Sequence, residues 1–243
     1  MTLPRVSCLC PTFARAALLE EAIESFLRQD YAGEKELIVL NDFTEQFLHF
    51  EHPEVRVHNL GERATSLGEK RHKAAELSSG EFLMTWGDDD IHLPWRISRM
   101  VNSIRTNSSP FVLEGWHFVI QFDGIFLNRW STCGAHIVSR KFYDQVGGIP
   151  FQDSGEDVEF NRLGQQVLGR PVPHVKDNPA FVYRWHGTRR PHVSGIGRED
   201  PYARMLERAL THVQEGEEPS GDIQLQPTWR SNYLNLPAQA VIR

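Results

Sequence analysis

Short apolar segments of strand character alternate with segments of helical periodicity through the first 107 residues, and this alternation constrains the fold most. Buried strands are predicted at residues 5–10, 36–40, 55–58 and 82–86, and helices at residues 20–29 and 68–77. In the first helical segment, apolar side chains recur at three- and four-residue spacing, which is typical of an amphipathic helix. Strands separated by helices form parallel sheets with helices on their faces. We therefore predict an α/β protein with a mostly parallel sheet flanked by helices.

The pattern changes after residue 107, where a further helix predicted at residues 95–107 ends. The Asp123-Gly124 pair lies between two apolar segments and predicts a hairpin. Later elements are expected at residues 135–138, 141–146, 157–168, 180–184 and 202–213, with a loop or linker at residues 215–221. The tail, residues 222–243, is either a docked extension or poorly ordered. We divide the chain into residues 1–107, a second half of the same domain at 108–197, and a C-terminal helix and extension at 198–243.

Charge, apolar runs and cysteine content argue against several classes of protein. The net charge of −6 argues against a general nucleic-acid binder, which would be basic. No apolar run approaches the ~20 residues of a membrane span, and the chain enters its first strand without a recognisable signal peptide. Cys8, Cys10 and Cys133 make no disulfide framework, so we expect reduced thiols. We therefore expect a cytoplasmic protein and leave peripheral association with a membrane open.

Three adjacent carboxylates, Asp88, Asp89 and Asp90, follow the strand predicted at residues 82–86. The carboxyl ends of strands are where open α/β sheets bind ligands. Adjacent carboxylates repel each other unless a cation lies between them, and hard oxygen ligands suit Mg²⁺ or Mn²⁺. The alternative is a solvated acidic turn, or an aspartate that caps the helix after Pro94. The flanking sequence has to decide between these two interpretations.

Six short motifs, spread over about residues 4–192, together resemble the inverting glycosyltransferases of family 2, which use nucleotide sugars. They are residues 6–10 with Pro11-Thr12-Phe13-Ala14-Arg15, residues 37–40 with Asn41-Asp42, residues 68–75 with Ser79-Gly80-Glu81, Asp88-Asp89-Asp90 with Leu93-Pro94, Val146-Gly147-Gly148, and Glu156-Asp157. The chain departs from the family at Phe43-Thr44, where Gly-Ser is usual, at His72, and at Gly87, where many members have an aspartate. The resemblance implies the GT-A fold, with a Rossmann-like sheet and a smaller acceptor-side hairpin region. Residues 1–107 would bind the nucleotide sugar, and residues 108–197 would bind the acceptor and carry the catalytic residues.

The resemblance also implies roles for individual residues. The donor-binding residues it implies are Pro11, Thr12, Arg15, Asp42, Arg71, Asp88 and Asp89. Asp42 would accept the ring N–H of a uracil-type base, which favours a UDP-sugar or a dTDP-sugar. Asp89 or Asp90 would hold Mn²⁺ or Mg²⁺, with His186 as a further candidate ligand. The alternatives are that Asp42 is a turn-forming residue and that Arg71 lies on a solvated helix face.

Glu156 and Asp157 follow Gly155 at the start of a predicted helix, so that one carboxylate can point into a cleft. The resemblance favours Asp157 as the general base for the acceptor hydroxyl, with Glu156 as its rival. Acidic residues in the first turn of a helix also complement its dipole, which is the structural alternative.

We therefore predict a metal-dependent inverting glycosyltransferase that acts on a glycan, lipid-linked or other hydroxyl acceptor. Two alternatives stay open: a nucleotidyltransferase and a non-catalytic module that binds nucleotide sugars. Residues 11–15 contain no glycine, which counts against the phosphate loop of a nucleotidyltransferase. The presence of both acidic motifs counts against a non-catalytic module.

Overall fold

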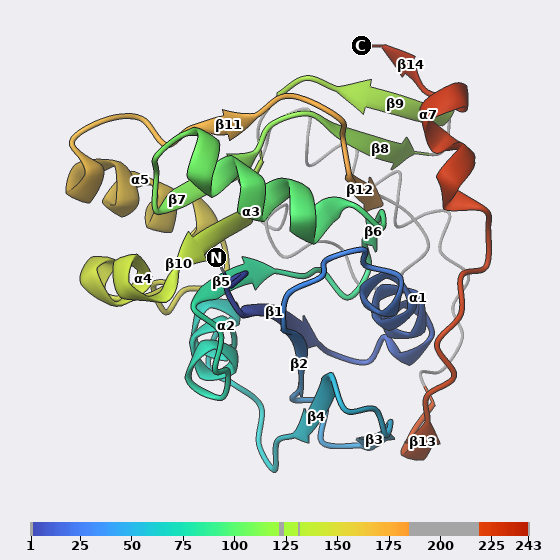
Figure 1. The fold of residues 1–243 in the computed structure, drawn as a ribbon. Helices are drawn as coiled ribbons and strands as arrows, with labels where there is room; N and C mark the ends of the chain where they lie inside the picture. Colours follow the sequence, from blue (N-terminus) through green and yellow to red (C-terminus); the bar gives the residue numbers. More distant parts are fainter. Residues whose placement is uncertain (1, 122–123, 131, 185–218, 243) are drawn as a thin grey trace, which may run out of the picture.

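The computed structural model describes residues 2–121, 124–130, 132–184 and 219–242, and Figure 1 shows its fold. A seven-stranded sheet has the strand order β11-β7-β10-β5-β1-β2-β4. Its strands are β1 (Val6–Thr12), β2 (Lys35–Asn41), β4 (Val55–Asn59), β5 (Phe82–Thr85), β7 (Phe111–Glu114), β10 (Thr132–Ser139) and β11 (His174–Val175). Only β10 runs antiparallel to its neighbours, β5 and β7. The predicted mostly parallel sheet is therefore confirmed.

Helices cover both faces of this sheet. They are α1 (Ala16–Leu27), α2 (Leu67–Glu76), α3 (Arg96–Thr106), α4 (Arg140–Val146) and α5 (Glu156–Leu168). Helices α1 and α3 share one apolar cluster with Cys8 and Cys10, whereas α2, α4 and α5 share another with Leu9. This division follows from the alternation of side chains along β1. Cys8 and Cys10 are buried and free, as predicted, and no described helix is long and apolar enough to cross a membrane.

A second sheet of five strands lies beside the first and has the order β14-β9-β8-β12-β6. Its strands are β6 (Ile91–His92), β8 (His117–Gln121), β9 (Gly124–Asn128), β12 (Phe181–Arg184) and β14 (Val241–Ile242). The antiparallel pair β8 and β9 confirms the predicted hairpin, although Asp123 of its turn lies outside the described residues.

The C-terminal segment, residues 219–242, is docked on the rest of the chain, which decides between the two alternatives for the tail. Strand β13 (Gly221–Gln224) pairs with β3 (Gln46–His49), so residue 221 belongs to a strand and not to the predicted loop. The segment then passes α1 and continues through η2 (Tyr233–Asn235), α7 (Leu236–Gln239) and β14, as the red ribbon in Figure 1 shows. The helix predicted at residues 202–213 lies outside the described residues.

Pro11 does not end the first strand, contrary to the prediction, because β1 continues to Thr12. The backbone N–H of Trp86 donates to the carbonyl oxygen of Leu9 over 3.0 Å, so residues 9 and 11 direct their backbone polar groups toward β5. Strand β5 ends at Thr85, one residue before that contact. The missing N–H of Pro11 therefore removes no hydrogen bond from the sheet.

Candidate active site

The parallel strands β1, β2 and β5 end at the same edge of the large sheet, and the predicted donor-site residues follow these ends. Thr12 directly follows Pro11 and is the last residue of β1, Asp42 follows β2, and Asp88 comes shortly after β5. Thr12, Asp42 and Asp88 are all buried. The structure therefore brings together residues that are far apart in the sequence.

Asp42 is held by Lys70 of α2, a residue that the sequence analysis missed. The Lys70 ammonium contacts both Asp42 Oδ1 and the carbonyl oxygen of Thr12, and the backbone N–H of Ala64 donates to Asp42 Oδ2 over 3.2 Å. Lys70 is only 5% exposed, and this burial lowers its pKa. Lys70 directly precedes Arg71 in the motif at residues 68–75. The direction in which the Lys70 side chain points depends on how α2 packs against β1 and β2, which the sequence does not show.

Aromatic side chains lie next to Asp42. The half-buried rings of Phe13 and Phe43 have centroids 5.0 Å apart, and the guanidinium of Arg63 lies 4.4 Å from the Phe13 centroid. Phe43 occupies a position where family 2 enzymes usually have glycine, so the departure adds a ring at this edge of the sheet. A flat aromatic base can stack on such a surface.

Two arginines contact the acidic turn, which consists of Asp88, Asp89 and Asp90. Arg15 Nη1 lies 3.2 Å from Asp88 Oδ1 and 2.6 Å from Asp89 Oδ2. The backbone N–H of Arg184 donates to Asp90 Oδ1 over 3.1 Å, and the Arg184 side chain donates to the Asp89 carbonyl oxygen. Burial raises the pKa of Asp88 and of Asp90, and the neighbouring Asp89 carboxylate raises the pKa of Asp90 further. Additional positive charge at this turn would favour the ionised carboxylates.

The Asp90 side chain lies close to Gly87. A Cβ atom at residue 87 would lie 2.3 Å from Asp90 Oδ2, so Asp90 folds back over the glycine. Any larger residue at position 87 would displace the Asp90 carboxylate.

The acidic turn offers carboxylate oxygens, the ligand type of hard divalent cations, but the described residues contain no group of three or more His, Cys, Asp or Glu side chains placed to hold a metal ion. Mg²⁺ is commonly held by only one or two carboxylates, with waters and substrate phosphates as its other ligands. Asp88 and Asp90 supply buried carboxyl oxygens, and burial is the main reason that their pKa values are raised. His186, the further candidate ligand, lies outside the described residues.

Glu156 and Asp157 are adjacent in sequence but have different surroundings. Gly155, with a φ of 75°, turns the chain into α5, as predicted for a sharp turn at this position. Glu156 is buried, and its Oε1 lies 2.8 Å from Arg71 Nη1 of α2. Burial raises the pKa of Glu156, and Arg71 opposes this shift. Arg71 therefore does not lie on a solvated helix face.

Asp157 is half-exposed and lies against β10. A Cβ atom on Gly134 would lie 3.1 Å from Asp157 Oδ2. Since β10 runs antiparallel to β5 and the His136 amide donates to Thr85 Oγ1 over 2.9 Å, Gly134 lies toward the carboxyl end of β5. Asp157 is therefore placed toward the same edge of the sheet as the acidic turn.

Comparison with known proteins identifies the family. The profile of glycosyl transferase family 2 matches residues 7–154, which is more than half of the chain. The chain belongs to this family. The predicted glycosyltransferase family and fold class are thereby confirmed, and no curated protein matches the sequence significantly.

Solved structures of S. aureus TarS share the fold of this chain. Residues 1–349 of S. aureus TarS in complex with UDP-GlcNAc align with a TM-score of 0.64 and 15% identity, over 87% of this chain and 68% of that one. The same TarS fragment without a named ligand aligns with a TM-score of 0.60 and 16% identity, over 74% and 60% of the two chains. Its complex with UDP gives 0.59 and 16%, over 75% and 61%. The chain thus spans about 60–68% of the length of these TarS chains.

The family 2 profile covers only part of the candidate site. Arg15, Asp42, Lys70, Arg71 and the acidic turn lie within the matched residues 7–154. Glu156, Asp157 and Arg184 lie beyond them, although contacts join Glu156 to Arg71 and Arg184 to the acidic turn. The fold thus completes the site with residues outside the family profile.

Proposed function

We propose that the chain is a metal-dependent inverting glycosyltransferase that moves a sugar from a UDP-sugar, or a dTDP-sugar, to a hydroxyl group of an acceptor. The observation that carries this proposal is the placement of Asp42 and the acidic turn at one edge of the sheet, both buried and both held by basic side chains. The TarS structures with UDP-GlcNAc and with UDP support a uridine nucleotide as the donor class.

Asp42 is the group that would select the base. Its carboxylate is held by Lys70 and by the Ala64 amide, and each carboxylate oxygen can accept a further hydrogen bond. A uracil or thymine ring offers an imide N–H as donor, whereas adenine does not. The rings of Phe13 and Phe43 beside this carboxylate would pack against the base.

Asp89 and Asp90 would hold Mn²⁺ or Mg²⁺, and Asp88 would reach the ribose or the sugar. When bound, the cation supplies positive charge to the diphosphate that leaves. Arg15 contacts Asp88 and Asp89 and would hold both carboxylates in place. Arg71 lies on α2 beside Glu156, and we assign it to the diphosphate as well.

Asp157 would take the proton of the attacking acceptor hydroxyl. Inversion by direct displacement needs one carboxylate on the side of the sugar opposite the diphosphate. Asp157 is half-exposed, whereas Glu156 is buried and its carboxylate is paired with Arg71. These surroundings favour Asp157 over Glu156 as the base.

A panel of nucleotide sugars, incubated with the chain and Mn²⁺, tests the proposal. We expect release of UDP or dTDP from at least one sugar nucleotide, and loss of this release in EDTA. Asp89→Ala and Asp90→Ala should lose the Mn²⁺-dependent turnover while their circular dichroism spectra stay unchanged. Pyrophosphate release from a nucleoside triphosphate, or binding without turnover, would contradict the proposal.

A further inference from the structure

A continuous set of polar contacts joins the C-terminal segment to the acidic turn. The set begins at Tyr233 of η2, passes through Glu21 of α1 and Arg184 of β12, and ends at Asp89 and Asp90. Tyr233 and Arg184 lie outside the residues that match family 2. These contacts connect parts of the chain that lie far apart in the sequence.

Glu21 is the centre of this set and is only 2% exposed. Its Oε2 accepts a hydrogen bond from Arg184 Nη1 over 2.6 Å, and its Oε1 accepts from the Tyr233 hydroxyl over 2.7 Å and from the Arg230 amide over 3.0 Å. Burial would raise the pKa of Glu21, but these donors outweigh it and lower the pKa, so the group is a carboxylate. A buried carboxylate with charged and neutral donors on both oxygens has a fixed orientation.

Arg184 transmits this orientation to the acidic turn. While Nη1 contacts Glu21, Nε donates to the Asp89 carbonyl oxygen and the backbone N–H donates to Asp90 Oδ1 over 3.1 Å. One planar guanidinium thus binds both Glu21 and the Asp89 carbonyl oxygen, which links the position of the buried carboxylate to the backbone of the acidic turn. Adjacent carboxylates repel one another, and the turn therefore depends on such donors for its shape.

We propose that Tyr233 is a positioning residue of the donor site, which acts through Glu21 and Arg184 to hold Asp89 and Asp90 where a divalent cation and a diphosphate bind. This inference rests on the proposed function. The C-terminal segment then contributes to donor affinity, in addition to covering α1.

Tyr233→Phe tests the inference because it removes only the hydroxyl that contacts Glu21. We expect the affinity for UDP in the presence of Mn²⁺, measured by isothermal titration, to fall roughly threefold to tenfold, the scale of one typical net hydrogen bond. The Mn²⁺ concentration at half-saturation should rise as well. Glu21→Gln keeps the shape of the side chain but removes its charge, and it should weaken UDP binding further.

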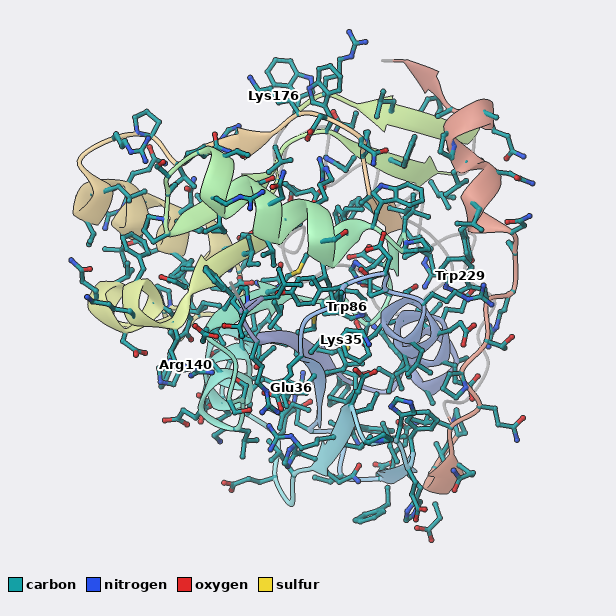
Figure 2. The ribbon with its side chains drawn as sticks, viewed as in Figure 1. Lys35, Glu36, Trp86, Arg140, Lys176 and Trp229 are labelled. Atoms are coloured by element: carbon teal, nitrogen blue, oxygen red, sulfur yellow. The ribbon has the colours of Figure 1, made fainter. Side chains whose placement is uncertain are left out.

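Trp229→Phe is the matched control. Trp229 belongs to the same segment and packs edge-on against the Tyr233 ring, with centroids 5.5 Å apart, but it forms no hydrogen bond with Glu21. Phenylalanine keeps an aromatic ring at this position. Trp229 Nε1 donates to Ser25 Oγ of α1 over 2.9 Å, and Figure 2 shows the side chain beside that helix. Both variants should lower the melting temperature, but only Tyr233→Phe should weaken binding of UDP and Mn²⁺. Equal UDP affinities for Tyr233→Phe and Trp229→Phe would overturn the inference while the proposed function stands. If the unaltered chain binds no UDP with Mn²⁺, the proposed function fails, and the inference fails with it.

Discussion

At the scale of single residues, the fold gives two adjacent carboxylates different properties. Glu156 is buried against Arg71, whereas Asp157 is half-exposed beside Gly134. The sequence places both at the start of a helix. One step along a helix turns a side chain by about 100°, so the two carboxylates face different surroundings, but the sequence does not show which of them faces a cleft. The packing of α5 against α2 and β10 decides which carboxylate is available to an acceptor.

Asp157→Asn should lower kcat by roughly 10²-fold or more, the scale of lost general-base catalysis, because the amide cannot take a proton. The dissociation constant for UDP should barely change, since Asp157 does not contact the nucleotide. Steady-state kinetics and titration of UDP measure the two quantities separately. Glu156→Gln is the matched control: if it is inactive while Asp157→Asn turns over normally, the base is Glu156.

At the scale of elements, α2 contributes more to the site than its motif indicates. The sequence predicts the helix within a residue of its bounds and identifies Arg71, but not the contact of Lys70 with Asp42. Long elements such as α3 were predictable because their apolar residues recur with helical periodicity. The strands β3, β6, β7 and β11 were not predicted, because each has only two to four residues and depends on pairing with distant segments.

Lys70→Met should destabilise the fold by about 3–5 kcal/mol, because it leaves the Asp42 carboxylate buried without its partner. The side chains of Lys70 and Asp42 are 6% and 5% exposed. Urea unfolding measures the free energy, and the double variant with Asp42→Asn should recover part of the loss. Lys73→Met on the same helix, which breaks an exposed ion pair with Glu69, should have little effect. Equal effects of the two lysine variants would contradict the assigned role of Lys70.

At the scale of the whole molecule, the two edges of the large sheet have separate roles. The carboxyl ends of β1, β2 and β5 carry the candidate site, and the opposite ends carry a polar cluster around Glu36. Glu36 accepts hydrogen bonds from Ser7 Oγ over 2.6 Å, from the Ser79 amide over 2.7 Å and from Arg56 over 2.7 Å. Recognisable motifs predicted the residues of the candidate site, but no motif indicated the cluster around Glu36.

The Glu36 cluster should make the free energy of unfolding depend on pH in the acid range. Burial opposes ionisation, but the hydrogen bonds from Ser7 and Ser79 outweigh it and lower the pKa of Glu36 from 4.5 to about 2. Because the folded pKa is depressed, this stabilisation is fully present above pH 4.5 and is lost as the pH falls toward about 2. Denaturant unfolding between these pH values should show a shallower dependence for Glu36→Gln. An unchanged dependence would contradict the assigned role of Glu36.

The C-terminal segment illustrates what one-dimensional patterns miss at this scale. Tyr233 and Arg184 contact Glu21 only because the chain returns to α1 after leaving the residues that match the family. The tertiary fold sets contacts between such distant positions. The position of Glu21 on an amphipathic helix therefore does not indicate that it contacts Tyr233 and Arg184.

We propose that the carboxyl ends of β1, β2 and β5 form the binding site for a uridine nucleotide with a divalent cation. Isothermal titration of UDP and ADP into the unaltered chain, each with Mn²⁺ and with EDTA, tests this claim most directly. We expect UDP to bind more tightly than ADP, because Asp42 can accept an imide N–H that adenine lacks, and we expect EDTA to weaken UDP binding. Equal affinities for UDP and ADP, or UDP binding that is indifferent to EDTA, would contradict the claim.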